Sequence, residues 1–277
     1  MLRLMYITKN PEVALIAEKV GVDRIFIDLE YIGKNLRQGG MDTVQNRHTS
    51  KDVKKVKKVL TKSKVMARVN PIHNMSFKNK YKGSEFEIAS VIRAGADIVM
   101  LPYFKTADEV RRFVKAVKGR AKTLLLFETV ESIQNIDEIL SVKGIDEVFI
   151  GLNDLSLGFG HKFMFKLLAD GTVDRIIEKF KEKNLPYGFG GVASLTGGAL
   201  PGGKVIAEHY RLGSTCVILS RSFCNTDAIN DISVIDATFK SGIKEIREFE
   251  NFCEKQNNPF FDENKKNVVK IVDEICR

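Results

Sequence analysis

The chain has 277 residues, of which 44% are hydrophobic and 29% are charged, an ordinary balance for a globular protein with one large core. Apolar residues recur along its whole length, which excludes extended disorder, and no apolar run approaches the roughly 20 residues that cross a bilayer. The formal net charge of +9 would suit nucleic acid, but no nucleic-acid-binding motif accompanies it. We therefore expect neither nucleic acid nor a membrane as a partner.

The start of the chain and its cysteines predict a cytoplasmic protein. Residues 1–8 are too few and too soon polar to form a signal peptide. No two of the four cysteines have the CxxC spacing of a zinc knuckle or a thioredoxin-like motif, and a chain of this length needs no disulfides. We expect free thiols at Cys216, Cys224, Cys253 and Cys276.

Eight short runs of apolar or β-branched residues follow one another, and each is nearly continuously apolar, as in strands buried on both faces. These predicted strands cover residues 2–8, 24–30, 64–70, 97–103, 123–129, 147–154, 187–193 and 216–222. Segments of helical period lie between them, among them residues 11–20, 84–94, 107–118 and 132–140. The predicted helices end near Gly21, Gly95, Gly144 and Gly213, and some begin after Thr8, Thr106 and Thr129.

Strands that alternate with helices predict an α/β protein with a (β/α)₈ barrel fold. An open doubly wound sheet is the main alternative, but it would usually carry a glycine-rich turn after the first strand, and residues 8–11 contain no glycine. We assign residues 1–226 to the barrel core. Residues 227–277 form a C-terminal helical arm, predicted as helices 234–253 and 262–276, within the same domain or at an oligomer interface.

Charged side chains stand at the carboxyl ends of several predicted strands, where chemistry occurs in such barrels. These are Asp28, Glu30, Arg68, Glu128 and Asp154. Glu128 and Asp154 belong to adjacent strands, and two carboxylates without a nearby histidine suit a hard divalent ion such as Mg²⁺ or Mn²⁺. Capping of the following helices, or pairing with Arg68, would explain these carboxylates equally well.

The Arg68 side chain is suited to hold a substrate carboxylate or to neutralise a developing enolate, and a structural ion pair with Asp28 or Glu30 is the alternative. Two histidines lie in loops at the same end, His48 and His73. The long polar stretch 37–48 contains Arg37 and Arg47 and could grip an anionic substrate. An ordinary exposed loop is the simpler explanation of each histidine.

The glycines at 188, 190 and 191, with Arg221 after the eighth strand, are compatible with a phosphate on the substrate. Tight turns explain these glycines as well. His161 and His209 are interpreted as loop or helix-surface residues.

Five segments in this order resemble the HpcH/HpaI aldolase and citrate lyase β-subunit family. They are IDLE at 27–30, ARVN at 67–70, GADIVMLP at 95–102, FETVES at 127–132 and FIGLNDLS at 149–156. The family fold is also a (β/α)₈ barrel. The resemblance implies a carbon–carbon lyase of the metal-dependent, class II aldolase type, which acts on a 2-oxo acid such as pyruvate or oxaloacetate through an enolate.

Applied to single residues, the resemblance implies that Glu128 and Asp154 bind the divalent metal, with Mg²⁺ favoured over Mn²⁺ or Co²⁺. Arg68 then contacts the carbonyl oxygen of an anionic small-molecule substrate, and the backbone amides of Asn153 and Asp154 receive its carboxylate. Family members are commonly multimers, so we expect a homo-oligomer. An acyl-CoA lyase of the citrate lyase β type, and a non-catalytic barrel that binds an anionic ligand, stay open as alternatives.

One position departs from the family pattern. Pyruvate aldolases of the family place a histidine acid/base after Asp-x-Glu and citrate lyase relatives place an aspartate, whereas this chain has Tyr31. A phenol is a poor general base at neutral pH. The candidates for the acid/base are therefore Tyr31 itself, His73, His48 and a metal-bound water.

Overall fold

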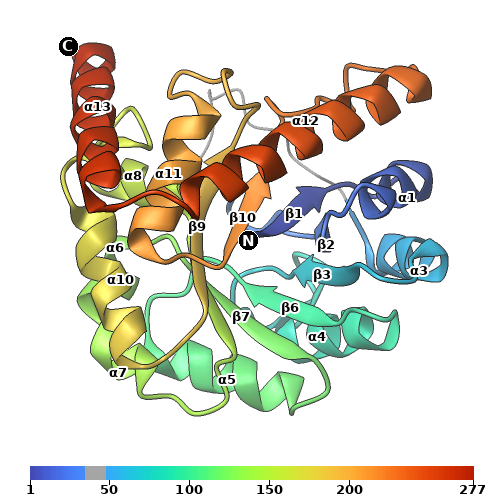
Figure 1. Ribbon diagram of the computed structural model, residues 1–277. Helices are drawn as coiled ribbons and strands as arrows, with labels where there is room; N and C mark the ends of the chain where they lie inside the picture. Colours follow the sequence, from blue (N-terminus) through green and yellow to red (C-terminus); the bar gives the residue numbers. More distant parts are fainter. Residues whose placement is uncertain (35–47) are drawn as a thin grey trace.

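A computed structural model describes residues 1–34 and 48–277. In this part of the chain, parallel strands close into a barrel in the order β1-β10-β9-β8-β7-β6-β3-β2 (Figure 1). The barrel strands are β1 (Arg3–Ile7), β2 (Arg24–Asp28), β3 (Lys64–Arg68), β6 (Ile98–Leu101), β7 (Lys122–Phe127), β8 (Glu147–Ile150), β9 (Tyr187–Val192) and β10 (Cys216–Leu219). Each falls within a predicted run except for one residue of β7, and the predicted (β/α)₈ barrel is confirmed.

Helices surround the barrel and follow its strands along the chain (Figure 1). They are α1 (Pro11–Lys19), α3 (Ser50–Val59), α4 (Ser84–Arg93), α5 (Ala107–Val117), α6 (Val130–Gln134), α7 (Ile136–Leu140), α8 (Leu152–Gly158), α9 (Lys166–Ala169), α10 (Thr172–Glu182), α11 (Gly202–Leu212), α12 (Ile232–Cys253) and α13 (Asn258–Cys276). A small hairpin, β4 (Met75–Ser76) and β5 (Tyr81–Lys82), follows β3. None of the described helices combines the length and the apolar character needed to cross a membrane.

The helix ends agree with the predicted caps at most positions. Thr106 and Thr129 accept hydrogen bonds from the backbone N–H groups of Glu109 and Ser132. The prediction for Thr8 is wrong, because Asn10 caps α1 through its side chain while Thr8 accepts the N–H of Asn10. The single helix predicted over residues 132–140 is two short helices, α6 and α7, which meet at a non-helical Asn135.

Alternate residues of each strand point into the barrel, and this alternation determines which side chains line its interior. Along β2, Phe26 lies inside the barrel in an apolar cluster, whereas Ile25 and Ile27 pack outward in the main core against the helices. Since side chains alternate along a strand, Arg24 and Asp28 face the same way as Phe26. The interior therefore has an ionic amino end, an apolar middle and a polar carboxyl end.

His209 corrects the expectation of a helix-surface residue. It is fully buried because it lies four residues after Val205 and three before Leu212, on the inner face of α11. Its ring stacks on Phe189 with centroids 3.8 Å apart, and Nδ1 lies 2.8 Å from Ser214 Oγ. Burial lowers the pKa of His209 to about 3, so the ring is neutral near pH 7.

The last two helices pack on the same chain. α12 lies against α1 and α11, and α13 lies against α11 and α9 (Figure 1). Val268 and Val272 of α13 are fully buried, and Asn264 Nδ2 donates to Glu208 Oε1 at 2.9 Å. The helical arm is therefore present as predicted, while its contact with a partner subunit stays a prediction. Each of the four cysteines is a free thiol, as expected.

Candidate active site

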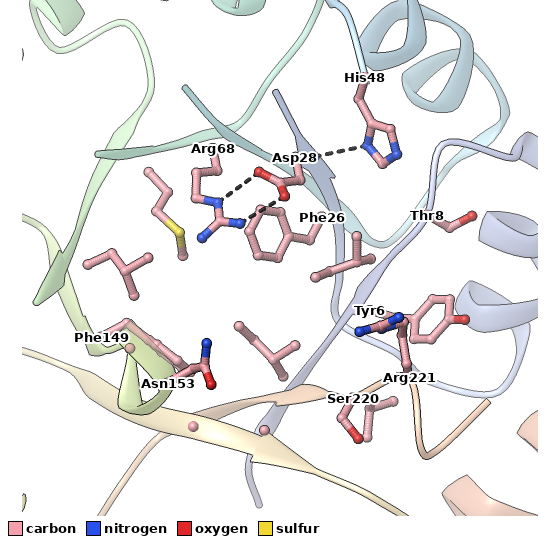
Figure 2. A pocket seen from close by; sticks show the side chains of 18 of the residues that line it. Tyr6, Thr8, Phe26, Asp28, His48, Arg68, Phe149, Asn153, Ser220 and Arg221 are labelled. Carbon is pink, nitrogen blue, oxygen red and sulfur yellow. Dashed lines mark hydrogen bonds and ion pairs between the residues drawn. The ribbon is translucent and has the colours of Figure 1, made fainter. Parts of the chain in front are cut away.

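A cavity of about 960 Å³ opens at the carboxyl end of the barrel, near the upper end of the about 300–1,000 Å³ that ligand pockets span. Phe26, Phe149 and other apolar side chains from inside the barrel line it, together with polar residues that follow the strands (Figure 2). Several residues singled out in the sequence line this cavity, namely Asp28, His48, Arg68, Glu128, Asn153, Asp154, Gly190, Gly191 and Arg221. Arg37 and Arg47 lie outside the described residues.

Arg68 is held by two carboxylates, Asp28 at the end of β2 and Glu30 two residues later, and Figure 2 shows its pair with Asp28. Its Nε and Nη2 donate to the two oxygens of Asp28, each at 2.8 Å, and Nη1 lies 3.3 Å from Glu30 Oε2. The ring of Phe26 lies beneath the guanidinium, 5.6 Å from its central carbon. The ion pair considered from the sequence is thus present, and the same side chain also lines the cavity.

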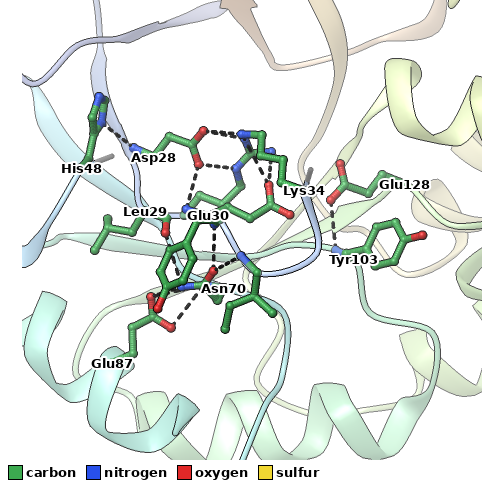
Figure 3. A network of polar contacts seen from close by, with 12 residues as sticks. Asp28, Leu29, Glu30, Lys34, His48, Asn70, Glu87, Tyr103 and Glu128 are labelled. Carbon is green, nitrogen blue, oxygen red and sulfur yellow. Dashed lines mark hydrogen bonds and ion pairs between the residues drawn. The ribbon is translucent and has the colours of Figure 1, made fainter. Parts of the chain in front are cut away.

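Lys34 completes this ionic network, and sequence reasoning missed it. Its Nζ donates to Asp28 Oδ2 at 2.9 Å and lies 3.8 Å from Glu30 Oε2 (Figure 3). Lys34 is buried and lines the cavity. The only indication in the sequence was the spacing of four residues between Glu30 and Lys34. A glutamate and a lysine at this spacing also occur in many surface turns.

The network fixes the charges of its members. Burial alone would raise the pKa of Asp28, but Arg68 and Lys34 more than offset this and hold it well below its usual range. Burial would likewise lower the pKa of Arg68, yet Asp28 and Glu30 keep it above its ordinary value. Both groups are therefore charged at neutral pH, and Arg68 presents a permanent positive charge to the cavity.

Glu128 and Asp154 have the donor chemistry of a divalent-ion site. Glu128 is buried, and its Oε1 accepts the backbone N–H of Tyr103 at 3.0 Å (Figure 3). Gly151 makes room for it, because a Cβ there would lie 2.8 Å from Glu128 Oε2. Both carboxylates line the cavity, and such hard oxygen donors fit Mg²⁺ or Mn²⁺.

The described residues contain no cluster of three or more His, Cys, Asp or Glu side chains able to hold a metal ion. An ion bound by Glu128 and Asp154 would therefore take its remaining ligands from water or substrate oxygens, as Mg²⁺ commonly does. Asn153 lies beside this pair in the first turn of α8, with Nδ2 3.4 Å from Asp154 Oδ1.

His48 lines the cavity next to Asp28. Its Nδ1 accepts the backbone N–H of Asp28 at 3.0 Å (Figure 2), so the proton of the neutral ring is on Nε2. Burial lowers the pKa of His48, and the nearby Asp28 opposes this only in part. In this state His48 can donate a hydrogen bond from Nε2 but has no free lone pair there to take a proton.

Tyr31 and His73 do not line the cavity. Tyr31 is 54% exposed, and its backbone N–H is held by Asn70 Oδ1 at 2.9 Å. The rings of Tyr31 and His73 both pack edge-on to Tyr81 of the hairpin, with centroids 6.1 and 5.6 Å away. Burial and the neighbouring Glu87 raise the pKa of Tyr31. This placement counts against the predicted acid/base role of either residue.

The opposite wall of the cavity holds polar residues that the sequence analysis largely missed. They follow β1 and β10 and include Thr8, Lys9, Asn10, Ser220, Asn225, Thr226 and Asp227. Arg221, noted in the sequence for its charge, lines the same wall (Figure 2). These residues had no recognisable motif, and only the closure of the barrel brings them to the cavity.

The fold and the site together define a (β/α)₈ barrel with paired carboxylates and a partly buried arginine at the mouth. The profile of the HpcH/HpaI aldolase/citrate lyase family matches residues 3–166, more than half of the chain. The chain belongs to this family, as the motifs in the sequence implied.

Curated relatives carry aldolase names. A 2-keto-3-deoxy-L-rhamnonate aldolase of Escherichia coli O17:K52:H18 is 34% identical over 110 residues, which is 29% of this chain and 41% of the relative. A hydroxypyruvate/pyruvate aldolase of Sagittula stellata is 33% identical over 104 residues, 27% of this chain and 41% of the relative. The chain thus matches less than half of the length of either relative.

Among solved structures, the HpcH/HpaI aldolase from Desulfitobacterium hafniense DCB-2 is similar to this chain, with a TM-score of 0.58. The sequence identity is 16%, and the similarity covers 89% of this chain and 93% of the other. This likeness supports the barrel fold.

Proposed function

We propose that the protein is a metal-dependent carbon–carbon lyase that cleaves or forms a bond next to a 2-oxo acid, as an aldolase does. The observation that carries the proposal is the convergence of Glu128, Asp154 and Arg68 on one cavity. Membership of the family and the aldolase names of the curated relatives support it.

Arg68 would stabilise the negative charge that develops on the substrate. Asp28 occupies its Nε and one N–H of Nη2, and Glu30 lies near Nη1, so an N–H remains on each Nη atom for a substrate oxygen. Because Asp28 and Glu30 hold the guanidinium in place, and Lys34 in turn holds Asp28, little reorganisation is needed when the charge appears. The backbone amides of Asn153 and Asp154 would bind the substrate carboxylate.

Glu128 and Asp154 would hold the divalent ion, and Mg²⁺ is our first choice among Mg²⁺, Mn²⁺ and Co²⁺. When bound, such an ion supplies a Lewis acid that polarises the 2-oxo group. His48 would orient a substrate oxygen by donating a hydrogen bond from Nε2. The apolar floor of Phe26 and Phe149 limits water near the reacting carbon and strengthens these interactions.

Decarboxylation of oxaloacetate tests the proposal, because this reaction requires the enolate but no aldol acid/base. We expect turnover that depends on added Mg²⁺ or Mn²⁺. Replacing the carboxylates, by Glu128→Gln or Asp154→Asn, should abolish both turnover and divalent-ion binding measured by titration calorimetry, because a neutral amide is a far weaker ligand. Glu138→Gln on α7 is the matched control, since that exposed carboxylate lies away from the cavity.

Undiminished metal affinity in both cavity variants would reject the proposed metal site. If neither turnover nor divalent-ion binding is found in the parent protein, the non-catalytic binding protein is favoured. Turnover only with CoA esters would instead favour an acyl-CoA lyase.

A further inference from the structure

Lys34 is a buried cation of the cavity to which the proposed reaction assigns no contact with substrate. Its side chain is only 6% exposed, and it lines the cavity from the segment that follows β2. Lysine is rarely buried, because taking an ammonium group out of water costs free energy unless partners compensate for it. The contacts that hold Lys34 in this place therefore decide what it can do.

Hydrogen bonds to Asn70 fix the backbone that carries Lys34. Asn70 Oδ1 accepts the backbone N–H groups of Tyr31 and Ile32, each at 2.9 Å. The N–H of Lys34 donates to Tyr31 O at 3.3 Å and closes a turn, in which Gly33 has a φ of 75° that glycine adopts without strain. The Lys34 side chain thus reaches the cavity from an anchored turn.

Lys34 and Arg68 share both carboxylates of the ionic network (Figure 3). Asp28 Oδ2 accepts from Lys34 Nζ at 2.9 Å and from Arg68 Nη2 at 2.8 Å. Glu30 Oε2 lies 3.8 Å from Lys34 Nζ and 3.3 Å from Arg68 Nη1. Because Nζ and Nη2 bind one and the same oxygen, they are close enough together for a second oxygen, on the side of the cavity, to accept an N–H from each.

Lys34 has donors left for such an oxygen. An ammonium group carries three N–H bonds. Among the residues that the structure describes, only Asp28 accepts one of them, since the 3.8 Å to Glu30 is too long for a hydrogen bond. Arg68 keeps an N–H on each Nη atom. The two cations therefore form a pair of donors that line one cavity.

We propose that Lys34 is a second catalytic cation, which donates a hydrogen bond to the same 2-oxo oxygen as Arg68 when that oxygen becomes negative in the enolate. The inference rests on the proposed function, which brings the oxygen to Arg68. Lys34 keeps its proton throughout, so no proton moves at this residue. Its part is the stabilisation of charge by a donor held in advance, which differs from the acid/base role considered for Tyr31, His73 and His48.

Titration of the metal-free protein with oxalate tests the paired cations without turnover, because oxalate is a dianion whose adjacent oxygens resemble those of the pyruvate enolate. We expect Lys34→Gln to bind oxalate about tenfold or more weakly than the parent, the effect of losing one charge-assisted hydrogen bond. Lys34→Arg, which keeps the charge, should lose less affinity.

Lys78→Gln is the matched control, because Lys78 is exposed between β4 and β5 and does not line the cavity. Lys34→Gln should fold, since its amide can still donate to Asp28 and Asp28 keeps Arg68, and urea unfolding verifies this. Absence of oxalate binding in the parent, or equal affinity in the parent and in Lys34→Gln, would overturn the proposal.

A double-variant cycle separates contact with the ligand from a role in holding Arg68. Arg68→Lys removes the guanidinium but keeps a positive charge beside Asp28, so oxalate binding should stay measurable. If Lys34 contacts the ligand, adding Lys34→Gln to Arg68→Lys should weaken oxalate binding severalfold further. If Lys34 only holds the guanidinium through Asp28, the second substitution adds no loss, and Lys34 is not a catalytic residue.

Turnover gives the last readout. Lys34→Gln should lower kcat for oxaloacetate decarboxylation about 10²-fold or more, as for one lost oxyanion donor, and an unchanged kcat would reject the inference about Lys34 alone. If the parent shows neither decarboxylation nor aldol cleavage, the proposed function is rejected, whereas the oxalate titrations still decide whether Lys34 and Arg68 bind one anion together.

Discussion

The two ends of the barrel interior each hold an arginine that is paired with a buried carboxylate through two hydrogen bonds. At the amino end, Arg24 donates to both oxygens of Glu147 at 2.7 and 2.9 Å. At the carboxyl end, Arg68 donates to both oxygens of Asp28 at 2.8 Å. Only the second pair lines the cavity. The same chemistry therefore serves structure at one end and a site at the other.

The two ion pairs differ in whether a ligand can reach the arginine. Arg24 and Phe26 lie on the same face of β2 as Asp28, so the apolar cluster of Phe26, Met66 and Met100 separates the two ion pairs. Arg24 and Glu147 are buried, whereas an N–H on each Nη atom of Arg68 remains for a ligand. We expect substitutions at the amino end to change stability and substitutions at the carboxyl end to change turnover.

The largest expected effect is on stability, from Arg24→Met. Glu147 would lose its bidentate partner while buried, and breaking a buried pair typically costs about 3–5 kcal/mol. Arg3, 3.3 Å away, offsets part of this cost, so the lower end of the range is expected. Urea unfolding measures the loss, and kcat for oxaloacetate should be unchanged.

The double variant Arg24→Met with Glu147→Leu is the control for this first experiment. It removes both charges, so it should regain most of the lost free energy of unfolding. A loss below about 1 kcal/mol in Arg24→Met alone would mean that Arg3 and Lys122, whose Nζ lies 3.9 Å from Glu147 Oε1, already compensate Glu147.

A conservative change of the other arginine, Arg68→Lys, should act on turnover. Lysine keeps a positive charge beside Asp28 but loses the Nη atoms that would meet the substrate oxygen, so oxaloacetate turnover should fall about 10²- to 10³-fold, as for one lost oxyanion donor. Arg24→Lys is the matched control and should leave kcat unchanged. An equal effect of the two substitutions on kcat would remove the functional difference between the two ends.

The sequence predicted the barrel because its eight apolar runs and the glycines after its helices carry local signals. It also pointed to Arg68, Glu128 and Asp154, since each stands near the carboxyl end of a predicted strand. Lys34 and Lys9 escaped prediction, because only the closed barrel brings Lys34 to Asp28 and places Lys9 opposite Glu128. The exposed position of Tyr31 depends on the long-range hydrogen bond from its N–H to Asn70, which no local pattern encodes.

The smallest effect is expected at His48, which lies beside Asp28 at the carboxyl end. If it donates a hydrogen bond from Nε2, His48→Gln should lower aldol cleavage by no more than about tenfold, because the glutamine amide can also accept the Asp28 N–H and donate to the substrate. A general acid or base would be worth about 10²–10⁴-fold. Tyr31→Phe and His73→Gln, both away from the cavity, are the controls and should leave cleavage unchanged.

The pH profile separates the two roles of His48. Burial lowers the pKa of His48 below 6.5. The charge of Lys9 also lowers this pKa, whereas those of Asp28, Asp52 and Asp227 raise it. If the neutral ring served as the base, cleavage would fall as the pH dropped through that lowered pKa, since fewer rings would stay neutral, and His48→Gln would abolish this acid limb. If His48 only donates a hydrogen bond, the acid limb of kcat should be the same in the parent and in His48→Gln. This holds at every pH above the range in which His48 Nδ1 gains a proton. If His48→Gln loses that limb and cleavage also falls about 100-fold, His48 is the acid/base. Its contact with the Asp28 N–H must then break when substrate binds.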